Sequence, residues 1–459
     1  MLPFLTWQYS RPLAKFMKVT STYKDIWNIS YPIILGSLAT TVLNLTDTAF
    51  IARVGEVALG SMAITTVLYG VMIMIAISIG IGAQIMMARR AGEGNHPEIG
   101  RLFDHTFLLL LGLAAICFFI TYFFSGWFFS LILTSENIQK AAETYMIPRS
   151  FGLLAAITTI AFRSFYIGIS DTRVITYSAF LMLLLNAFLD YALIFGHFGF
   201  PEMGLKGAAV ASVISEFASL GFLVIYSKFR HEFEQYNLFR FVSMTRERLA
   251  SILDLASPII LQNTLSMGAW FVFFVVIEHL GERELAISNI IRSAYMVLMT
   301  PMWGYASATS SMVSNIIGQN KSEEVKLLVK KIITLSLLTT SVLFIISFAS
   351  PEWMLRIISS DEILIDDSKT SYFIVLSAMF IFAVSIILLS TVSGSGNTKP
   401  AMIIEIVNIS IYIIYIYICV FEFNTSIEAV WFSEIIYWFL MGLLSYLYLK
   451  YTKWAPVKI

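Results

Sequence analysis

Charge is scarce in this sequence. Lys, Arg, Asp and Glu make up 13% of its 459 residues, and 30 basic and 30 acidic side chains cancel to a net charge of zero. A soluble domain of this length needs far more charge on its surface, and a neutral chain has no electrostatic basis for binding nucleic acid. Cysteine is scarce too. Cys117 and Cys419 both lie in apolar stretches, which excludes a disulfide framework and a cysteine-ligated metal site.

Signatures of catalysis are also missing. The sequence has no HExxH zinc motif, no nucleophile elbow and no Walker nucleotide-binding loop. We therefore expect neither an enzyme nor a pump that hydrolyses ATP by itself. No cofactor is expected, and no bound metal other than a sodium ion.

Long apolar runs are what the sequence has in abundance. Hydrophobic residues make up 58% of the chain, and the mean hydropathy is +0.79. Since about 20 apolar residues in a helix cross a bilayer, we predict an all-α polytopic membrane protein embedded in lipid. The apolar runs between charged or Gly/Pro-marked breaks give twelve spans, at residues 26–52, 58–88, 102–127, 142–168, 174–196, 205–227, 249–280, 285–316, 325–349, 370–395, 401–422 and 427–449.

Basic residues segregate to one side of these spans. The N-terminal tail, the loops that follow even-numbered spans and the C-terminal tail carry 21 Lys and Arg residues, against 6 on the other side. The positive-inside rule places the richer side in the cytoplasm. We therefore predict a multi-pass plasma-membrane protein, in the inner membrane of a bacterium, with both termini cytoplasmic.

The chain repeats itself at a constant offset of 226 in residue number. This offset pairs Pro32 with Pro258, Gly55 with Gly281, Tyr69 with Tyr295, Gly92 with Gly318, and Gly168 with Gly394. A constant offset over such a distance predicts two six-helix lobes related by a pseudo-two-fold axis along the membrane normal, an arrangement suited to alternating access. The predicted organisation is a cytoplasmic segment 1–24, an N-lobe 25–227, a cytoplasmic inter-lobe loop 228–248, a C-lobe 249–450 and a cytoplasmic tail 451–459.

Two carboxylates stand where lipid-spanning helices are expected. Asp47 shares a helix face with Asn44, three residues earlier, and Asp190 shares one with Asn186, four residues earlier. At 1.5 Å per residue both carboxylates lie about 9 Å from the outer end of their helices, and Ser212 lies about 10 Å from the outer end of its own. Oxygen ligands at one level suit a sodium ion, and two close carboxylates equally suit a carried proton.

The repeat makes this cluster specific to the N-terminal half. At the offset of 226, the positions of Asp47, Asn186 and Asp190 are filled by Phe273, Tyr412 and Ile416. A requirement of the fold would tend to recur in both halves, whereas this cluster does not. The asymmetry favours a coupling-ion site over a structural role.

Further polar and bent positions are candidates for cavity or gating roles. Glu216 lies about 16 Å into its predicted helix, near the midplane, and Ser215-Glu216 resembles Ser433-Glu434 in the other half. Pro32 removes a helix hydrogen bond on the helix that carries Asp47 and permits a kink there. Glu405 lies close enough to the cytoplasmic end for its carboxylate to snorkel.

The ordered motifs resemble those of the multidrug and toxic compound extrusion (MATE) family. The resemblance covers nearly the whole chain. It rests on Pro32 and Asp47 followed by Val54-Gly55 and Ala58-Leu59-Gly60, on residues 168–173, on Asn186 and Asp190, on residues 204–212, and on Pro258 with residues 394–400.

The resemblance implies a twelve-helix, two-lobed exporter in which inward sodium or proton flow drives the expulsion of amphipathic or cationic drugs and toxins. The DinF-like branch places its cation site on residues that map here to Asp47, Asn186, Asp190 and Ser212. The acidic position of the NorM-like branch is Ser266 here. We expect a monomer. The alternative is a flippase of lipid-linked or other amphipathic substrates in the same superfamily; a non-transporting scaffold is less favoured.

Overall fold

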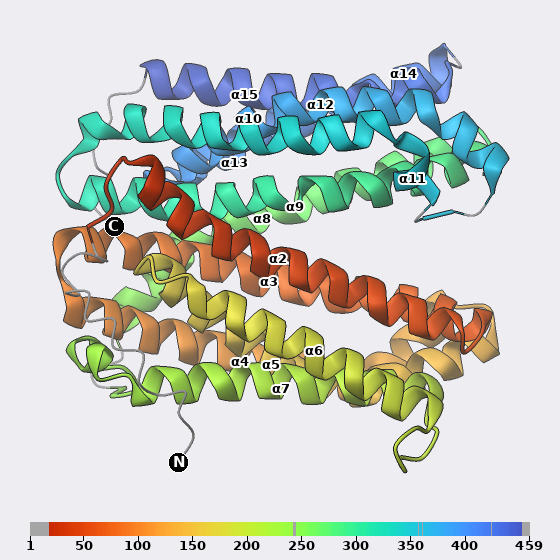
Figure 1. Cartoon of the computed structure of the whole chain (residues 1–459), viewed down its shortest axis with the longest axis horizontal. Helices are drawn as coiled ribbons and strands as arrows, with labels where there is room; N and C mark the ends of the chain where they lie inside the picture. Colours follow the sequence, from red (N-terminus) through yellow and green to blue (C-terminus); the bar gives the residue numbers. More distant parts are fainter. Residues whose placement is uncertain (1–17, 242–244, 357, 360, 424, 452–459) are drawn as a thin grey trace.

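The structure, a computed structural model, describes residues 18–241, 245–356, 358–359, 361–423 and 425–451. Within them, twelve long helices run alongside one another (Figure 1). They are α2 (Tyr23–Ala52), α3 (Glu56–Glu93), α4 (His96–Ile132), α5 (Glu136–Gly168), α6 (Arg173–Phe195), α7 (Gly204–Phe229), α8 (Arg246–Glu278), α9 (Glu282–Gly318), α10 (Val325–Ala349), α12 (Glu362–Gly394), α13 (Thr398–Tyr417) and α15 (Ser433–Tyr451). Short helical segments are η2 (His231–Tyr236), η3 (Ser322–Glu324), α11 (Pro351–Arg356), η4 (Ile418–Glu422) and α14 (Ile427–Trp431).

The predicted all-α polytopic class is confirmed, and every predicted span corresponds to a long helix. Several helices extend past the predicted edges. For example, α4 begins at His96, where the Asn95 side chain accepts a hydrogen bond from the Glu98 N–H, and α12 begins after Asp361, which caps two N–H groups. Such polar first turns extend a helix beyond its apolar run.

Eleven of the described helices are apolar and long enough to cross a membrane by composition alone, and α9 is not among them. Its second half, from Leu298 to Gly318, is rich in Ser, Thr and Asn, and nearly every side chain there is buried. A helix surrounded by protein does not need the apolar surface that lipid demands. The hydropathy of α9 is low because this helix lies inside the bundle.

The helices form two lobes that repeat one another. Figure 1 shows the N-lobe, α2–α7, beneath the C-lobe, α8–α15, with α2 running obliquely along the boundary between them. Helix α12, Glu362–Gly394, begins and ends at the positions that the predicted offset of 226 assigns to α5, Glu136–Gly168. We call the end of the bundle that carries linker residues 230–241 the linker end, and the opposite end the distal end.

The lobes meet toward the linker end, where α3 packs against α9 and α8, and α2 packs against α9. Backbones approach closely there: a Cβ built on Gly92 would lie 2.0 Å from the Asn315 carbonyl oxygen, and one on Gly318 would lie 2.2 Å from that of Arg89. Hydrogen bonds between the lobes, such as Ser314 Oγ to the Ile85 carbonyl at 2.7 Å, lie at mid-depth or nearer the linker end within the described residues. The structure is therefore closed at its linker end.

The linker between the lobes is fastened to the start of α4. The Asp104 carboxylate accepts hydrogen bonds from the backbone N–H groups of Phe239 and Phe241, at 2.8 and 2.9 Å. Glu98 forms an ion pair with Arg248 at 2.7 Å. Of the predicted terminal segments, residues 1–17 and 452–459 lie outside the described residues.

Candidate functional site

Three N-lobe helices bring the predicted cluster together. Asp47 on α2 and Asp190 on α6 are both buried, and their carboxyl groups lie within hydrogen-bonding reach of one another. Ser212 on α7 lies against Asp47, and its hydroxyl accepts a hydrogen bond from the Asn186 side-chain amide at 3.5 Å. The three residues that depth counting placed at one level, together with Asn186, thus form a single buried constellation.

This constellation has more acceptors than donors. Asp47 Oδ1, Asn186 Oδ1 and both carboxylate oxygens of Asp190 are buried, and no described residue donates a hydrogen bond to them. A buried acceptor without a donor is costly, and two adjacent carboxylates in a low dielectric cannot both stay charged without a compensating cation. The oxygens therefore suit a bound proton or an oxygen-seeking cation such as sodium.

An ion pair whose side chains are 13% and 12% exposed lies beside the constellation. Arg149 on α5 binds both oxygens of Glu216 on α7, each at 2.7 Å, and the Tyr69 hydroxyl of α3 donates to the same carboxylate at 3.0 Å. The Arg149 guanidinium also stacks over the Tyr69 ring, 4.0 Å from its centroid. Glu216 is thus neutralised inside the lobe, whereas Asp47 and Asp190 are not.

Sequence reasoning named Glu216 but did not pair it with Arg149 or Tyr69. One signal was present, because Tyr69 aligns with Tyr295 in the repeat, just as Ser215-Glu216 resembles Ser433-Glu434. The contact itself depends on how α3, α5 and α7 are rotated about their axes, and that rotation is not readable from one sequence.

The two α2 candidates lie away from the carboxyl pair. Asn44 is exposed and is not part of the buried constellation. Pro32 is buried, and its carbonyl accepts a hydrogen bond at 2.7 Å from Thr176 of α6, while Thr172 donates to the Ile29 carbonyl at 2.9 Å. Thr172, which precedes α6, and Thr176 in its first turn therefore bind the stretch of α2 where the proline interrupts the helical ladder.

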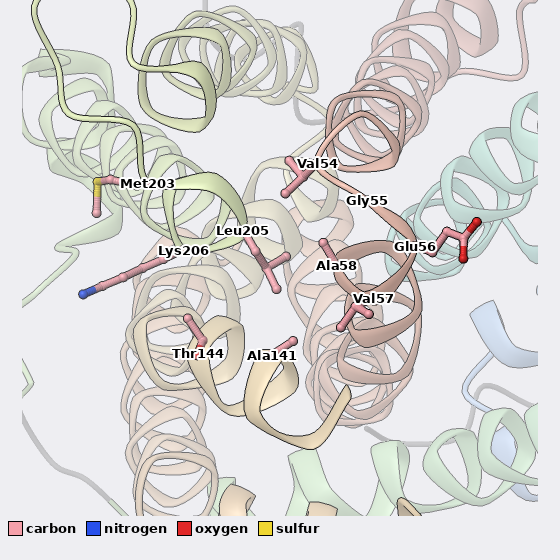
Figure 2. Close-up of a pocket in the computed structure, with 10 residues that line it drawn as sticks. All are labelled: Val54, Gly55, Glu56, Val57, Ala58, Ala141, Thr144, Met203, Leu205 and Lys206. Atoms are coloured by element: carbon pink, nitrogen blue, oxygen red, sulfur yellow. The ribbon is translucent and has the colours of Figure 1, made fainter. Parts of the chain in front are cut away.

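A pocket opens at the distal end of the N-lobe (Figure 2). It has a volume of about 680 Å³ and is lined by Val54, Gly55, Glu56, Val57, Ala58, Ala141, Thr144, Met203, Leu205 and Lys206. A buried apolar cluster that includes Ile51, Ile194 and Leu205 lies next to it. Ile51 and Ile194 follow Asp47 and Asp190 by one helical turn toward the distal end, so apolar side chains lie between the pocket and the carboxyl pair.

The equivalent positions of the C-lobe also meet, but they carry different chemistry. Phe273 and Tyr412 stand where Asp47 and Asn186 stand in the N-lobe, and their rings stack with centroids 6.1 Å apart. Trp431 packs edge-on against Phe273 at 5.0 Å. The same architectural position thus holds an aromatic core in one lobe and unpaired carboxylates in the other.

Comparison with known sequences gives a double match. The sequence profile of the family described as MatE matches residues 32–192 and again residues 258–418. The second match begins and ends at the positions that the offset of 226 assigns to the first, which confirms the repeat read from the sequence. One relative is a probable multidrug resistance protein NorM of Thermotoga maritima, 27% identical over 85% of this chain and 84% of its own length. Another is a probable multidrug resistance protein, YoeA, of Bacillus subtilis, 23% identical over 88% and 86%.

Solved structures share the fold. A crystal structure described as MATE in the straight conformation superposes with a TM-score of 0.88, at 19% identity, over 95% of this chain and 97% of its own. A mutant of the Vibrio cholerae MATE transporter VcmN gives a TM-score of 0.86, at 15% identity and the same coverage.

Proposed function

The chain belongs to the MATE family of membrane transporters, which are not enzymes, and on this premise we propose that it is a secondary active multidrug exporter. Its substrates are amphipathic or cationic small molecules, expelled against inward flow of protons or sodium ions. Relatives named as probable multidrug resistance proteins support this substrate class. The two-lobed fold, closed at one end, supports alternating access.

The observation that supports ion coupling is the pair of adjacent buried carboxyl groups that have no positive counter-charge. Asp47 and Asp190 adjoin one another, buried, and both oxygens of Asp190 lack a donor among the described residues. The nearby Arg149 is already engaged by Glu216. A proton or sodium ion is then the missing positive charge, bound between α2 and α6 with Asn186 and Ser212 as the remaining oxygen ligands.

The finer assignments belong to the same proposal. Asp47, Asn186 and Asp190 match the cation-site residues of the DinF-like branch, and Ser212 keeps the hydroxyl of the Thr found there, so we assign the chain to that branch. The linker end is cytoplasmic because the Lys and Arg excess lies there, so the linker-closed structure is an outward-facing state. The lobes comprise residues 25–227 and 249–450, and the transporter acts as a monomer.

The distal pocket provides the route by which the coupling ion arrives. It opens on the proposed external face, one apolar layer away from the carboxyl pair. A small displacement of Ile51 or Ile194 connects the two. Because the pocket lies within the N-lobe and not between the lobes, the ion reaches its site without passing the drug.

Transport in proteoliposomes tests this function. Efflux of a fluorescent cationic dye is measured with a sodium gradient and a pH gradient imposed separately. We expect one gradient to accelerate efflux, and the variants Asp47→Asn and Asp190→Asn to lower the driven rate by at least about 10-fold. Glu278→Gln, an exposed carboxylate at a helix end, serves as the matched control and keeps the wild-type rate. Efflux that responds to neither gradient, or carboxamide variants that transport at the wild-type rate, would overturn the coupling assignment.

A further inference from the structure

One basic side chain lies deep along a helix of the C-lobe without an acidic partner. Arg292 is ten residues from the first residue of α9, about 15 Å along the helix axis. Its guanidinium lies 5.0 Å from the centre of the Phe274 ring on α8, and no acidic side chain of the described residues forms an ion pair with it. An arginine at this depth is costly in lipid, so it marks a water-filled space or a ligand pathway.

The face of α9 that carries Arg292 is turned toward the N-lobe. Five side chains lie within about 40° of one another around the helix axis: Arg292, Met296, Trp303, Ser310 and Ser314. The two serines, at the linker end of this stripe, form hydrogen bonds with α3 of the N-lobe. Arg292 is exposed, as are Met296 at 45% and Trp303 at 41%. Exposed side chains on a face that points at the other lobe border the space between the lobes.

The elements around Arg292 carry no charge that would neutralise it. Arg292 is the single charged residue in 285–318 of α9, and residues 255–277 of α8 contain none. Across the lobe boundary, residues 26–46 of α2 and 57–88 of α3 contain none either. The repeat equivalent of Arg292 on α3 is Thr66. Because the N-lobe does without a cation here, the fold itself does not require one.

Aromatic rings adjoin the guanidinium. Phe274 stacks on Trp270, one turn earlier on α8, with centroids 6.0 Å apart and ring planes inclined by 26°. Both rings are half-buried. Exposed Trp303 lies about three turns from Arg292 toward the linker end. Flat rings attract flat apolar molecules, and a planar guanidinium pairs with an oxyanion through parallel N–H···O bonds. Together they suit a molecule that is aromatic at one end and anionic at the other.

We propose that Arg292 binds the anionic group of a substrate, and that the protein exports amphipathic aromatic anions as well as cationic drugs. The oxyanion pairs with the Arg292 guanidinium while the aromatic body of the substrate lies against the rings of α8 and α9. The inference rests on the proposed exporter function and extends its amphipathic substrate class to molecules of negative charge.

The coupling carboxylates do not oppose such a ligand. Ile34 is the residue of α2 that packs against Gly304 of α9. Asp47 lies thirteen residues further along α2, which places it about 140° away around the helix. It is buried inside the N-lobe beside Asp190. The negative charge of the substrate and the coupling-ion site therefore lie on opposite sides of α2.

Equilibrium binding to the purified full-length chain in phosphatidylcholine nanodiscs tests the proposal. Radiolabelled naphthalenesulfonate, a permanent anion, is compared with naphthalenesulfonamide, which has the same ring and no charge. We expect the wild-type chain to prefer the anion. Arg292→Gln should raise the dissociation constant of the anion by at least about 10-fold and that of the amide by less than about 2-fold. Arg292→Lys should keep part of the preference, because the charge remains while the paired donors are lost.

A matched control and a second assay separate a substrate contact from a structural role. Arg283→Gln removes an exposed arginine of the same helix that is already paired with Asp367, and it should leave both dissociation constants unchanged. Gradient-driven efflux from proteoliposomes is then measured on the same variants. Arg292→Gln should lose export of naphthalenesulfonate and keep the wild-type rate for a cationic dye.

The outcomes distinguish this inference from the general function. Equal affinity of the wild-type chain for the sulfonate and the sulfonamide overturns the anion site, while continued dye efflux leaves the exporter function standing. A preference that survives in Arg292→Gln overturns the site as well, and so does loss of dye efflux together with anion binding, because the arginine then supports the fold. If phosphatidylglycerol in the nanodiscs abolishes sulfonate binding, Arg292 belongs to a lipid headgroup and the substrate assignment falls. A wild-type chain that exports neither compound overturns both proposals.

Discussion

The closed linker end depends on two glycines, and adding one methyl group to either should open it. Gly92 on α3 faces the backbone carbonyl of Asn315, and Gly318 on α9 faces that of Arg89. Asn315 is the repeat equivalent of Arg89, as Gly318 is of Gly92, so the pseudo-two-fold axis makes the same contact twice. Gly92→Ala and Gly318→Ala therefore act on one interface from opposite sides.

The required displacement follows from the distances. A Cβ on Gly92 would lie 2.0 Å from the Asn315 oxygen, whereas ordinary contact begins at 3.4 Å, so α3 and α9 must move apart by the difference. The opposing atom is backbone and cannot rotate away as a side chain would. Overpacking of this kind costs about 1–3 kcal/mol. A conformation in which the lobes have parted here avoids that cost, so its population relative to the closed form should rise by about 5–150-fold.

Electron–electron distance measurements report this equilibrium. Spin labels at Glu93→Cys and Lys321→Cys, in a Cys117→Ala/Cys419→Ala background, span the end of α3 and the loop after α9. Each alanine variant should move population to longer distances. Gly112→Ala on α4, where an added Cβ meets nothing within 4 Å, is the matched control. Distance distributions in both variants that coincide with those of the control would refute the reasoning.

Two further perturbations probe the buried ion pair and the linker. Arg149→Met leaves Glu216 buried without its cation and should lower the free energy of unfolding by about 3–5 kcal/mol; adding Glu216→Gln should restore most of it, and thermal denaturation that fails to distinguish the two variants would contradict the account. Asp104→Asn replaces a charged acceptor of two backbone N–H groups, weakening that attachment by about 1.5–3 kcal/mol. Trypsin should then cut after Arg240 faster than in wild type, and an unchanged cleavage rate would mean that other contacts hold the linker.

The helices were predictable because a bilayer imposes their length and polarity. Even α9, too polar to qualify by composition, was located at residues 285–316 from its apolar run and the breaks on either side of it. Helix ends were less predictable. Polar turns such as those capped by Asn95 and Asp361 continue a helix beyond the apolar run, and nothing in the hydropathy marks where such a turn begins.

The N-lobe constellation could be found by counting depth, since a straight helix converts residue number directly into height. Rotation about the helix axis is harder to read. Asn44 lies three residues from Asp47, which leaves it about 60° away around the helix, and that is enough to place it on the exposed side. The prediction for Glu405 was wrong for a related reason. Its position along the helix suggested that the carboxylate snorkels to the helix end, whereas contacts with Ser266 and Tyr437 hold the carboxylate inside the bundle.

Helix α2 contributes residues both to the candidate ion site and to the interface between the lobes. Asp47 lies in its distal half, while Ile34 packs against Gly304 of α9, whose added Cβ would lie 3.2 Å from the Ile34 Cα. Pro32 lies beside that contact. It has no N–H to donate within the helix, and its carbonyl accepts a hydrogen bond from Thr176 of α6. A cation bound between Asp47 and Asp190 would therefore hold against α6 the same helix that contacts α9 near Pro32. The C-lobe equivalent, α8, has Pro258 but an aromatic stack in place of the carboxyl pair. Of these two equivalent helices, α2 is the one that carries both a proline and a carboxylate of the buried pair.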